Sequence, residues 1–417
     1  MQATGMRVLL RQATIADPRS PWNGQKTDIL IEGKKIGQIA TKIETEADEI
    51  IDLPGMIAAP GFTDIFSHFN DPGLEHKETL ETGAAAAKAG GFTRVMVLPN
   101  TKPAVHSKSQ VEYIVQKSRQ LPVDLLPIGA ISHQCEGKDL AEMHDMYLSG
   151  AVAFSDGLNP VQNSQVMLKA LQYVKTFGGT VIQVPDEVNL SRTGLVNEGV
   201  VSTRLGLPGK PALAETLILG RDIELLRYTG SKLHITGISS AASVELIRRA
   251  KKEGLAITCS VAPYHLWFSD EDLANYDTNL KVNPPLRTPA DTAALKEAVA
   301  DGTIDCIASH HHPHEWDSKV CEFEYAKYGM EGLETSFVAT ATALPNLSNE
   351  RLATLFAINP ATIFGLPLPV IDAGSQANLT IFQKNEGLVF NKMDIRSKSQ
   401  NNAFIGKTFK AAIIATL

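Results

Sequence analysis

One segment of the chain places a single histidine where two would make a metal site. Residues 60–73 read Pro-Gly-Phe-Thr-Asp-Ile-Phe-Ser-His-Phe-Asn-Asp-Pro-Gly. Side chains alternate along a strand, so a strand that ends in His-x-His directs two imidazoles to one face, and such a pair can bind Zn²⁺. Here the first position is Phe66, and only His68 has a nitrogen to donate. Because a phenyl ring has no lone pair for a metal, this segment predicts one ligand instead of two.

A second group of histidines follows much later in the chain. Residues 305–314 read Asp-Cys-Ile-Ala-Ser-His-His-His-Pro-His, which has the composition of a metal-binding tract. Side chains at the end of a strand alternate in direction, however, so these four imidazoles cannot all reach one ion. We expect one or two of them to face a pocket and the others to be structural.

Short apolar runs alternate with helical patterns through the middle of the chain, and these elements must position the histidines. Strands are predicted at residues 57–65, 93–98, 124–131, 151–155, 180–184, 232–238, 256–261 and 304–308. Helices are predicted at residues 77–89, 160–177, 212–228, 240–253 and 289–300. Eight strands with helices between them indicate an α/β fold, a parallel (β/α)₈ barrel of TIM type. In that fold chemistry lies at the C-terminal ends of the strands, where both histidine motifs fall.

Both ends of the chain are rich in short predicted strands, at residues 6–10, 28–32, 35–39, 378–382 and 409–415. We therefore expect residues 1–54 and 366–417 to form one small β-domain beside a barrel of residues 55–365. Carboxylates on the predicted helices, such as Glu215, Asp222 and Glu224, are interpreted as a solvated face.

The composition excludes several classes of partner. The net charge of −7 gives no reason to expect nucleic acid, and no run of 18 apolar residues predicts a membrane span. Four cysteines are scattered without a C-x-x-C pair, which is typical of reduced thiols in a cytoplasmic protein: Cys135, Cys259, Cys306 and Cys321.

Several motifs taken together resemble the dihydroorotases of the class I bacterial type, within the amidohydrolase superfamily. The resemblance runs from about residue 30 to about residue 410, and other cyclic amidohydrolases such as allantoinases share parts of it. It implies enzymes that interconvert carbamoyl-aspartate and dihydroorotate, with a zinc-bound hydroxide attacking the ring carbonyl and an aspartate moving the proton. The motifs lie at residues 60–73, 77–103, 150–157, 196–209, 233–254, 279–288, 305–314 and 329–337.

Carried over position by position, the resemblance implies that most of the family's metal ligands are missing here. The first histidine of the strand-1 pair falls on Phe66, and the histidines expected after strands 5 and 6 fall on Val184 and Gly237. The strand-8 aspartate that moves the proton falls on His310. The arginine that binds the substrate carboxylate falls on Asn70, and an amide cannot replace a bidentate guanidinium.

The resemblance also implies positions that are retained. His68 and Asp156 match metal ligands, and together with His310 they could form a reduced site of three ligands plus water. We therefore expect either no metal or one weakly bound zinc, and no binuclear centre. Positions that contact substrate in the family are retained at Asn100, Asn283 and His314.

Three functions follow from these patterns. The first is a dihydroorotase-like protein of pyrimidine biosynthesis that is catalytically inactive, forms a homodimer and serves as a structural partner of aspartate carbamoyltransferase, as the resemblance to inactive homologues implies. The alternative is an active cyclic amidohydrolase, a dihydroorotase with a mononuclear zinc site. The second alternative is a metal-free protein that binds a small molecule in the old pocket.

Overall fold

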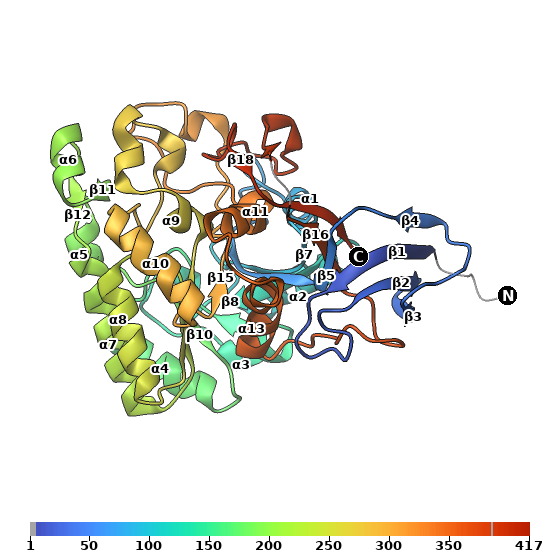
Figure 1. Ribbon diagram of the computed structural model, residues 1–417. Coiled ribbons are helices and arrows are strands. Elements are labelled where there is room, and N and C mark those ends of the chain that lie inside the picture. The colour runs from blue at the N-terminus through green and yellow to red at the C-terminus, as the bar shows by residue number, and fades with distance from the viewer. Residues whose placement is uncertain (1–5, 385–386) are drawn as a thin grey trace.

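The computed structural model describes residues 6–384 and 387–417, and a parallel barrel forms its centre (Figure 1). Eight strands follow one another in the sheet in sequence order, and every pairing between them is parallel. A bridge between Ser67 and His311 joins the end of the first strand to the segment after the eighth. The strands are β6 (Phe62–Ser67), β7 (Phe92–Val97), β8 (Asp124–Gly129), β9 (Ala153–Phe154), β10 (Val181–Gln183), β13 (Leu233–Ile235), β14 (Ile257–Val261) and β15 (Cys306–Ile307).

Helices cover the outside of this sheet, as the alternating pattern predicts (Figure 1). Capping fixes where several of them begin; Thr79, for example, accepts a hydrogen bond from the Thr82 amide at the start of α1. The helices are α1 (Leu80–Ala89), α2 (Lys108–Ser118), α3 (Met143–Leu148), α4 (Ser164–Lys175), α5 (Val188–Ser191), α6 (Val200–Leu205), α7 (Leu213–Thr229), α8 (Ala241–Lys252), α9 (Pro263–Trp267), α10 (Pro289–Asp301), α11 (Leu333–Ala343), α12 (Asn349–Ala353) and α13 (Asn359–Phe364).

A second sheet joins the two ends of the chain beside the barrel. Its strands run in the order β19-β16-β5-β1-β2-β3, with β4 paired to β1, so C-terminal strands lie next to N-terminal ones. They are β1 (Arg7–Ile15), β2 (Lys26–Glu32), β3 (Lys35–Ala40), β4 (Glu49–Ile51), β5 (Met56–Pro60), β16 (Leu379–Gln383) and β19 (Ala412–Thr416). Two short pairs lie outside both sheets: β11 (Val196–Asn197) with β12 (Gly209–Lys210), and β17 (Leu388–Val389) with β18 (Thr408–Phe409). The predicted (β/α)₈ barrel with a β-domain from both termini is confirmed.

The strand predicted at residues 57–65 is wrong in one respect, because it is two strands. β5 belongs to the β-domain, where it pairs with β16, and β6 begins the barrel. Gly61 lies between them, and a Cβ there would stand 1.8 Å from Asn378 Oδ1 and 2.4 Å from Thr93 Oγ1. The chain can pass from one sheet to the other at this point because glycine has no side chain.

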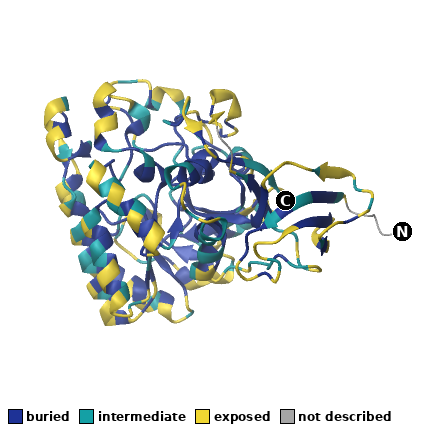
Figure 2. Ribbon diagram, viewed as in Figure 1, coloured by how far each residue is buried: buried dark blue, intermediate teal, exposed yellow. Residues whose placement is uncertain are grey.

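Burial follows the layers, with buried strands inside and exposed helix faces outside (Figure 2). Two of the helix carboxylates interpreted as solvated are instead buried. Glu215 accepts hydrogen bonds from the backbone amides of Ser239 and Ser240, and Asp222 forms a 2.7 Å ion pair with Arg221. Backbone amides and a neighbouring cation thus satisfy charges that periodicity alone places in water. None of the described helices is long and apolar enough to span a bilayer.

Candidate active site

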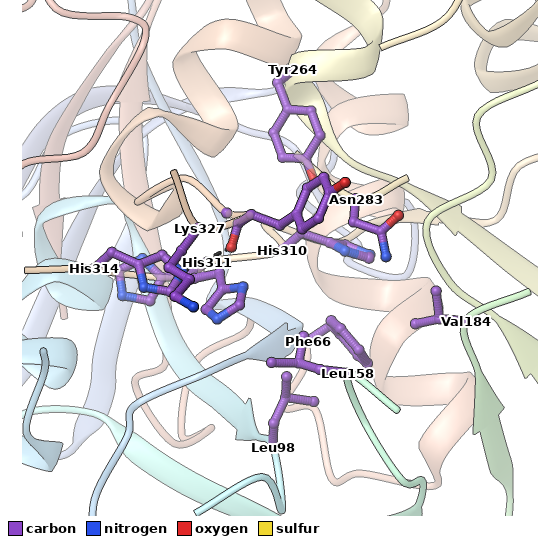
Figure 3. A pocket seen from close by; sticks show the side chains of 13 residues that line it. Phe66, Leu98, Leu158, Val184, Tyr264, Asn283, His310, His311, His314 and Lys327 are labelled. Atoms are coloured by element: carbon purple, nitrogen blue, oxygen red, sulfur yellow. Dashed lines mark hydrogen bonds between the residues drawn. The ribbon is translucent and has the colours of Figure 1, made fainter. Parts of the chain in front are cut away.

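A cavity of about 260 Å³ opens at the C-terminal ends of the barrel strands (Figure 3). One side of it, here called the apolar floor, consists of Phe66, Leu98, Leu158 and Val184. Another part of the lining, here called the polar wall, consists of Asn283, His310, His311, His312 and His314. Tyr264, Lys327, Tyr328 and Gly329 complete the lining. No aspartate or glutamate belongs to this lining.

Phe66 in the apolar floor packs directly against the polar wall. Its ring lies 4.6 Å from the ring of His310, centroid to centroid, at an interplanar angle of 33°. The side chain is almost fully buried, as is Val184 nearby. Both positions, where the resemblance expects imidazoles, therefore offer hydrocarbon to the cavity.

His68 follows β6 and bonds to protein atoms. Its Nε2 donates to the carbonyl of Asn100 at 2.9 Å, and its Nδ1 is enclosed without a partner. Burial lowers the pKa of His68 to about 4, so the imidazole is neutral at pH 7. Asn70, two residues on, is also buried and donates to the His68 carbonyl at 3.3 Å. Neither side chain belongs to the cavity lining.

Asp156 follows β9 and holds a backbone turn. Its carboxylate accepts hydrogen bonds from the Ser132 amide at 2.9 Å and from the Ser132 hydroxyl. Burial raises the pKa of Asp156 to about 6. Asn100 lies beside it, donating to the Asp156 carbonyl at 3.0 Å and accepting from the Leu158 amide at 2.9 Å. In this arrangement both side chains support the loops that carry the floor.

His310 follows β15 and fills space above Gly237. A Cβ at Gly237 would lie 2.8 Å from His310 Cε1, and Gly237 itself has a φ of +72°. The Nε2 of His310 bonds to the hydroxyl of Thr236 at 2.8 Å. Burial lowers the pKa of His310 to about 3, so this ring is neutral at pH 7 as well.

All four histidines of the tract belong to the residues that line the cavity, where the chain turns at His310 with a φ of +48°. The ring of His311, however, is fully buried: its Nε2 bonds to Glu78 at 3.3 Å and its Nδ1 accepts from the Gly332 amide at 3.2 Å, so this ring is structural. His314 donates from Nε2 to the Tyr328 carbonyl at 2.8 Å and accepts at Nδ1 from Lys77 at 3.4 Å.

Asn283 in the polar wall belongs to a polar group that sequence reasoning missed. Its Oδ1 accepts a hydrogen bond from Lys210, which also forms a 2.6 Å ion pair with Asp186. Lys210 and Asp186 are both buried. Asp186 lies in the segment after β10 and Lys210 ends the two-residue strand β12, neither of which has a periodicity of its own, so no pattern in the sequence indicates the pair.

The donor atoms do not fit the zinc centre that the resemblance implies. Phe66, Val184 and Gly237 offer no lone pair, and His68, Asp156 and His310 bond to Asn100, Ser132 and Thr236 respectively. Across residues 6–384 and 387–417, no group of three or more His, Cys, Asp or Glu side chains is placed to hold a metal ion.

Comparisons with known proteins agree on one family. Residues 55–243 match the family model described as dihydro-orotase-like. A dihydroorotase of Syntrophus aciditrophicus is 39% identical over 99% of this chain and 98% of its own length. A dihydroorotase of Pelotomaculum thermopropionicum is 40% identical over 99% of this chain and 97% of its own.

Solved structures share the fold at lower identity. An L-hydantoinase from Arthrobacter aurescens superimposes with a TM-score of 0.85 at 23% identity, covering 98% of this chain and 94% of that one. A dihydropyrimidinase from Brevibacillus agri gives a TM-score of 0.83 at 19% identity, covering 99% and 94%. These structures show the fold alone, whereas the identity to the curated relatives, which extends over nearly the whole chain, shows the family. This chain belongs to the dihydroorotase family of amidohydrolases.

Proposed function

We propose that this chain is a dihydroorotase-family protein without metal-dependent hydrolysis, which acts through binding and assembly. The observation that carries the proposal is the contact of the Phe66 ring with His310, at the two positions where the resemblance implies a metal-binding histidine and the proton-moving aspartate. Hydrolysis of a cyclic amide needs an activated hydroxide and a base. The cavity lining offers neither a carboxylate base nor a set of converging ligands for zinc.

A metal analysis beside a hydrolysis assay tests this proposal. The purified chain is incubated with Zn²⁺ and desalted, its metal content is measured, and dihydroorotate hydrolysis is followed by absorbance. We expect less than one tightly held zinc per chain and no turnover above the rate without protein. Stoichiometric zinc with steady turnover would contradict the proposal.

The role in assembly that we propose is that of a structural partner of aspartate carbamoyltransferase, with the chain itself a homodimer. Exposed large apolar side chains support a protein interface, since monomeric surfaces rarely gather them. Helix α7 exposes Leu213, Leu217 and Tyr228, whose spacing puts them on one helix face. A stable interface buries on the order of 1,200 Å² or more in total.

Co-expression with the carbamoyltransferase of the same organism tests this role. We expect the two proteins to co-purify and to elute together from a sizing column. Leu217→Glu should weaken whichever assembly uses the α7 face, whereas Val320→Glu, on the distant loop after β15, serves as a matched exposed control. A monomer that captures no carbamoyltransferase at micromolar concentration would exclude the role.

A second candidate is dihydroorotase activity itself, with one zinc on His68, Asp156 and His310. The names of the curated relatives, at 38–40% identity over nearly the whole chain, favour it. This candidate requires the three side chains to leave their present hydrogen bonds. His68→Asn, Asp156→Asn and His310→Asn should then each abolish zinc binding, which calorimetry measures directly.

A further inference from the structure

The loop of residues 390–407 lies against the barrel and is held at two places. The short pair of β17 and β18 closes its base, and buried carboxyl groups bind the stretch of residues 396–402, here called the strap. We infer that Glu331 and Glu334, which bind the strap from the barrel side, share one proton as an acid–carboxylate pair, and that this pair is a pH-sensitive latch for the strap.

Both members of the pair are buried where no described cation neutralises them. Glu331 is fully buried, and Glu334 is 6% exposed. The Arg396 amide of the strap donates to Glu334 Oε1, and the Asn402 side chain donates to Glu331 Oε2. Neither carboxyl group forms an ion pair with a lysine or arginine of the described chain. Two negative charges enclosed together in this way would repel each other, and burial strengthens the repulsion.

One proton resolves this conflict. Glu331 Oε1 and Glu334 Oε2 are the remaining oxygens, and no N–H or O–H group of the described chain donates to either of them. The two side chains nevertheless form a hydrogen bond with each other, which two carboxyl groups can do only if one of them carries a hydrogen. Burial and the neighbouring charge of Glu334 raise the pKa of Glu331 well above its ordinary value. The proton belongs to the pair, and the folded chain keeps it at a pH where a free glutamate has lost it.

His311 adjoins the pair but cannot serve as its cation. Its Nε2 lies 3.3 Å from Glu78 Oε2, and its Nδ1 lies 3.7 Å from Glu331 Oε1. The Gly332 amide donates to Nδ1 at 3.2 Å, so Nδ1 has a lone pair and no proton. The ring is therefore neutral, with its proton on Nε2, and it gives Glu331 no positive charge to pair with.

Charged groups on the other surrounding elements do not replace the shared proton. The Arg396 guanidinium donates to a backbone carbonyl of its own loop at 3.2 Å, and the Lys398 ammonium donates to a carbonyl before α1. Asp394 lines the same surface groove as Glu334, so it adds negative charge. Lys319 donates to a carbonyl two residues before Glu331, and burial lowers its pKa to about 7. An experiment on the latch must therefore compare proteins that all keep Lys319.

The strap in turn supports the loop that carries the histidine tract. Asn401 donates from Nδ2 to the carbonyls of His312 and Gly329, at 3.2 Å each. Its Oδ1 accepts from the His314 amide at 3.0 Å, and its carbonyl accepts from the Glu331 amide at 2.9 Å. Release of the strap therefore removes hydrogen bonds that fix the loop after β15.

The sign of the pH effect follows from the shared proton. The folded chain keeps a proton that an unfolded glutamate, with a pKa of 4.5, has already lost. The contribution of the pair to stability therefore falls as the pH rises from about 4.5 through the pKa of the folded pair. Above that pKa two buried carboxylates face each other, and opening of the strap lets water reach them.

Infrared difference spectroscopy on the full chain provides the first test, because a protonated carboxyl group has a C=O stretch that a carboxylate lacks. Between about pH 8 and pH 10 the wild-type protein should lose one such band, and Glu331→Gln should show none to lose. Asp156 and Asp222, with pKa values of about 6, are already ionised at the start of this range. A wild-type spectrum without a protonated carboxyl band at about pH 8 would overturn the shared proton, and a band that persists at about pH 10 would overturn the latch.

Limited proteolysis with trypsin provides the second test, because the strap contains the cleavage sites after Arg396 and Lys398. The rate of cleavage at these bonds is divided by the rate for an unstructured peptide at the same pH. In wild type this ratio should rise about tenfold or more from about pH 8 to pH 10, since each pH unit above the pKa of the pair favours the deprotonated, open strap about tenfold. In Glu331→Gln the ratio should rise less than about twofold, because the side-chain amide donates to Glu334 at every pH.

Two further variants separate the latch from other effects of pH. Glu334→Gln should behave like Glu331→Gln, because its amide then donates to Glu331 and replaces the proton from the other side. Glu297→Gln, the same exchange at an exposed position of α10, is the matched control and should keep the wild-type rise. All of these proteins retain Lys319, so its titration cannot distinguish them. An equal rise in wild type and in every variant, or no rise in wild type, would overturn the latch.

Discussion

The apolar floor and the polar wall of the cavity contain positions from the same family site, but they differ in kind. In the floor, Phe66 and Val184 stand where the resemblance implies imidazoles, and both are buried hydrocarbon. In the wall, Asn283, His310 and His314 keep polar atoms, each held by a specific partner. The floor therefore presents hydrocarbon to the cavity, whereas the wall presents side chains that already take part in hydrogen bonds.

The largest expected effect concerns catalysis, which needs both halves. If the proposed function holds, dihydroorotate hydrolysis by this chain with added zinc should be at least about 10⁶-fold slower than by the Syntrophus aciditrophicus relative under the same conditions, because a chain without an activated hydroxide and a base lacks the main sources of rate. Phe66→His should not restore hydrolysis, because Val184 and Gly237 still offer no side-chain nitrogen to a metal. Comparable turnover by the two proteins would show that the hydrocarbon floor does not prevent hydrolysis, and the contrast between floor and wall would then have no bearing on catalysis.

The next effect concerns packing in the floor. Phe66→Ala should lower the free energy of unfolding by about 3–4 kcal/mol, because removal of a fully buried ring that contacts His310 creates a cavity. Leu158→Ala, in the half-buried part of the same floor, should cost about 1 kcal/mol. Urea unfolding of both variants provides the measurement. Equal costs would show that Phe66 is not a packed floor residue.

A smaller effect separates steric conflict from backbone strain at Gly237. Gly237→Ala places a Cβ 2.8 Å from His310 Cε1 at a φ of +72°, so it should cost about 2–3 kcal/mol. Gly254→Ala has a similar φ of +83° and open space around the Cβ, so it should cost about 1 kcal/mol. Urea unfolding midpoints of the two variants measure the difference. An equal loss of stability in Gly237→Ala and Gly254→Ala would mean that the His310 ring can move away from Gly237 at no cost.

The sequence was sufficient for the architecture but not for the details of the site. Alternation of apolar runs and helices predicts the barrel, because strand and helix periodicity are local properties. The need for glycine at position 61, between β5 and β6, cannot be read from neighbouring residues. The atoms that leave no room for a side chain there belong to Asn378 and Thr93, which are distant in sequence.

The site shows the same limit more strongly. A histidine-rich segment predicts imidazoles at a strand end, but which of them reach the cavity depends on the turn at His310, where φ is +48°. The burial of Glu215 could not be read from helix periodicity, because amides at the start of α8 create the place for its charge. The hydrogen bonds that direct His310 likewise come from β14 and from the segment after β13, far apart in sequence.

The smallest effect expected here is a dependence of stability on pH, to which the wall and its surroundings contribute with opposite signs. Burial lowers the pKa of six imidazoles well below 6.5, so the unfolded chain binds more protons between about pH 4 and pH 6.5, and these groups make stability rise with pH there. Burial raises the pKa of several carboxyl groups, two of them from 3.8 to about 6, so the folded chain binds more protons between about pH 4 and pH 6, and these groups make stability fall with pH. The imidazoles are those of His68, His234, His265, His310, His312 and His314, and the two carboxyl groups are those of Asp156 and Asp222.

Asp156→Asn removes one of the groups that make stability fall as the pH rises. The slope of the free energy of unfolding against pH between pH 4 and pH 6 should therefore become more positive by up to about 1.4 kcal/mol per pH unit. The variant also loses the hydrogen bond that Asp156 accepts from the Ser132 hydroxyl, which lowers stability at every pH. The slope of stability against pH, and not stability itself, is therefore the quantity to compare. Urea unfolding at several pH values measures the slope, with Asp145→Asn, the same exchange at an exposed position, as the control. An unchanged slope in Asp156→Asn would mean that this carboxyl group is solvated, and that the loops supporting the floor are more open than their hydrogen bonds indicate.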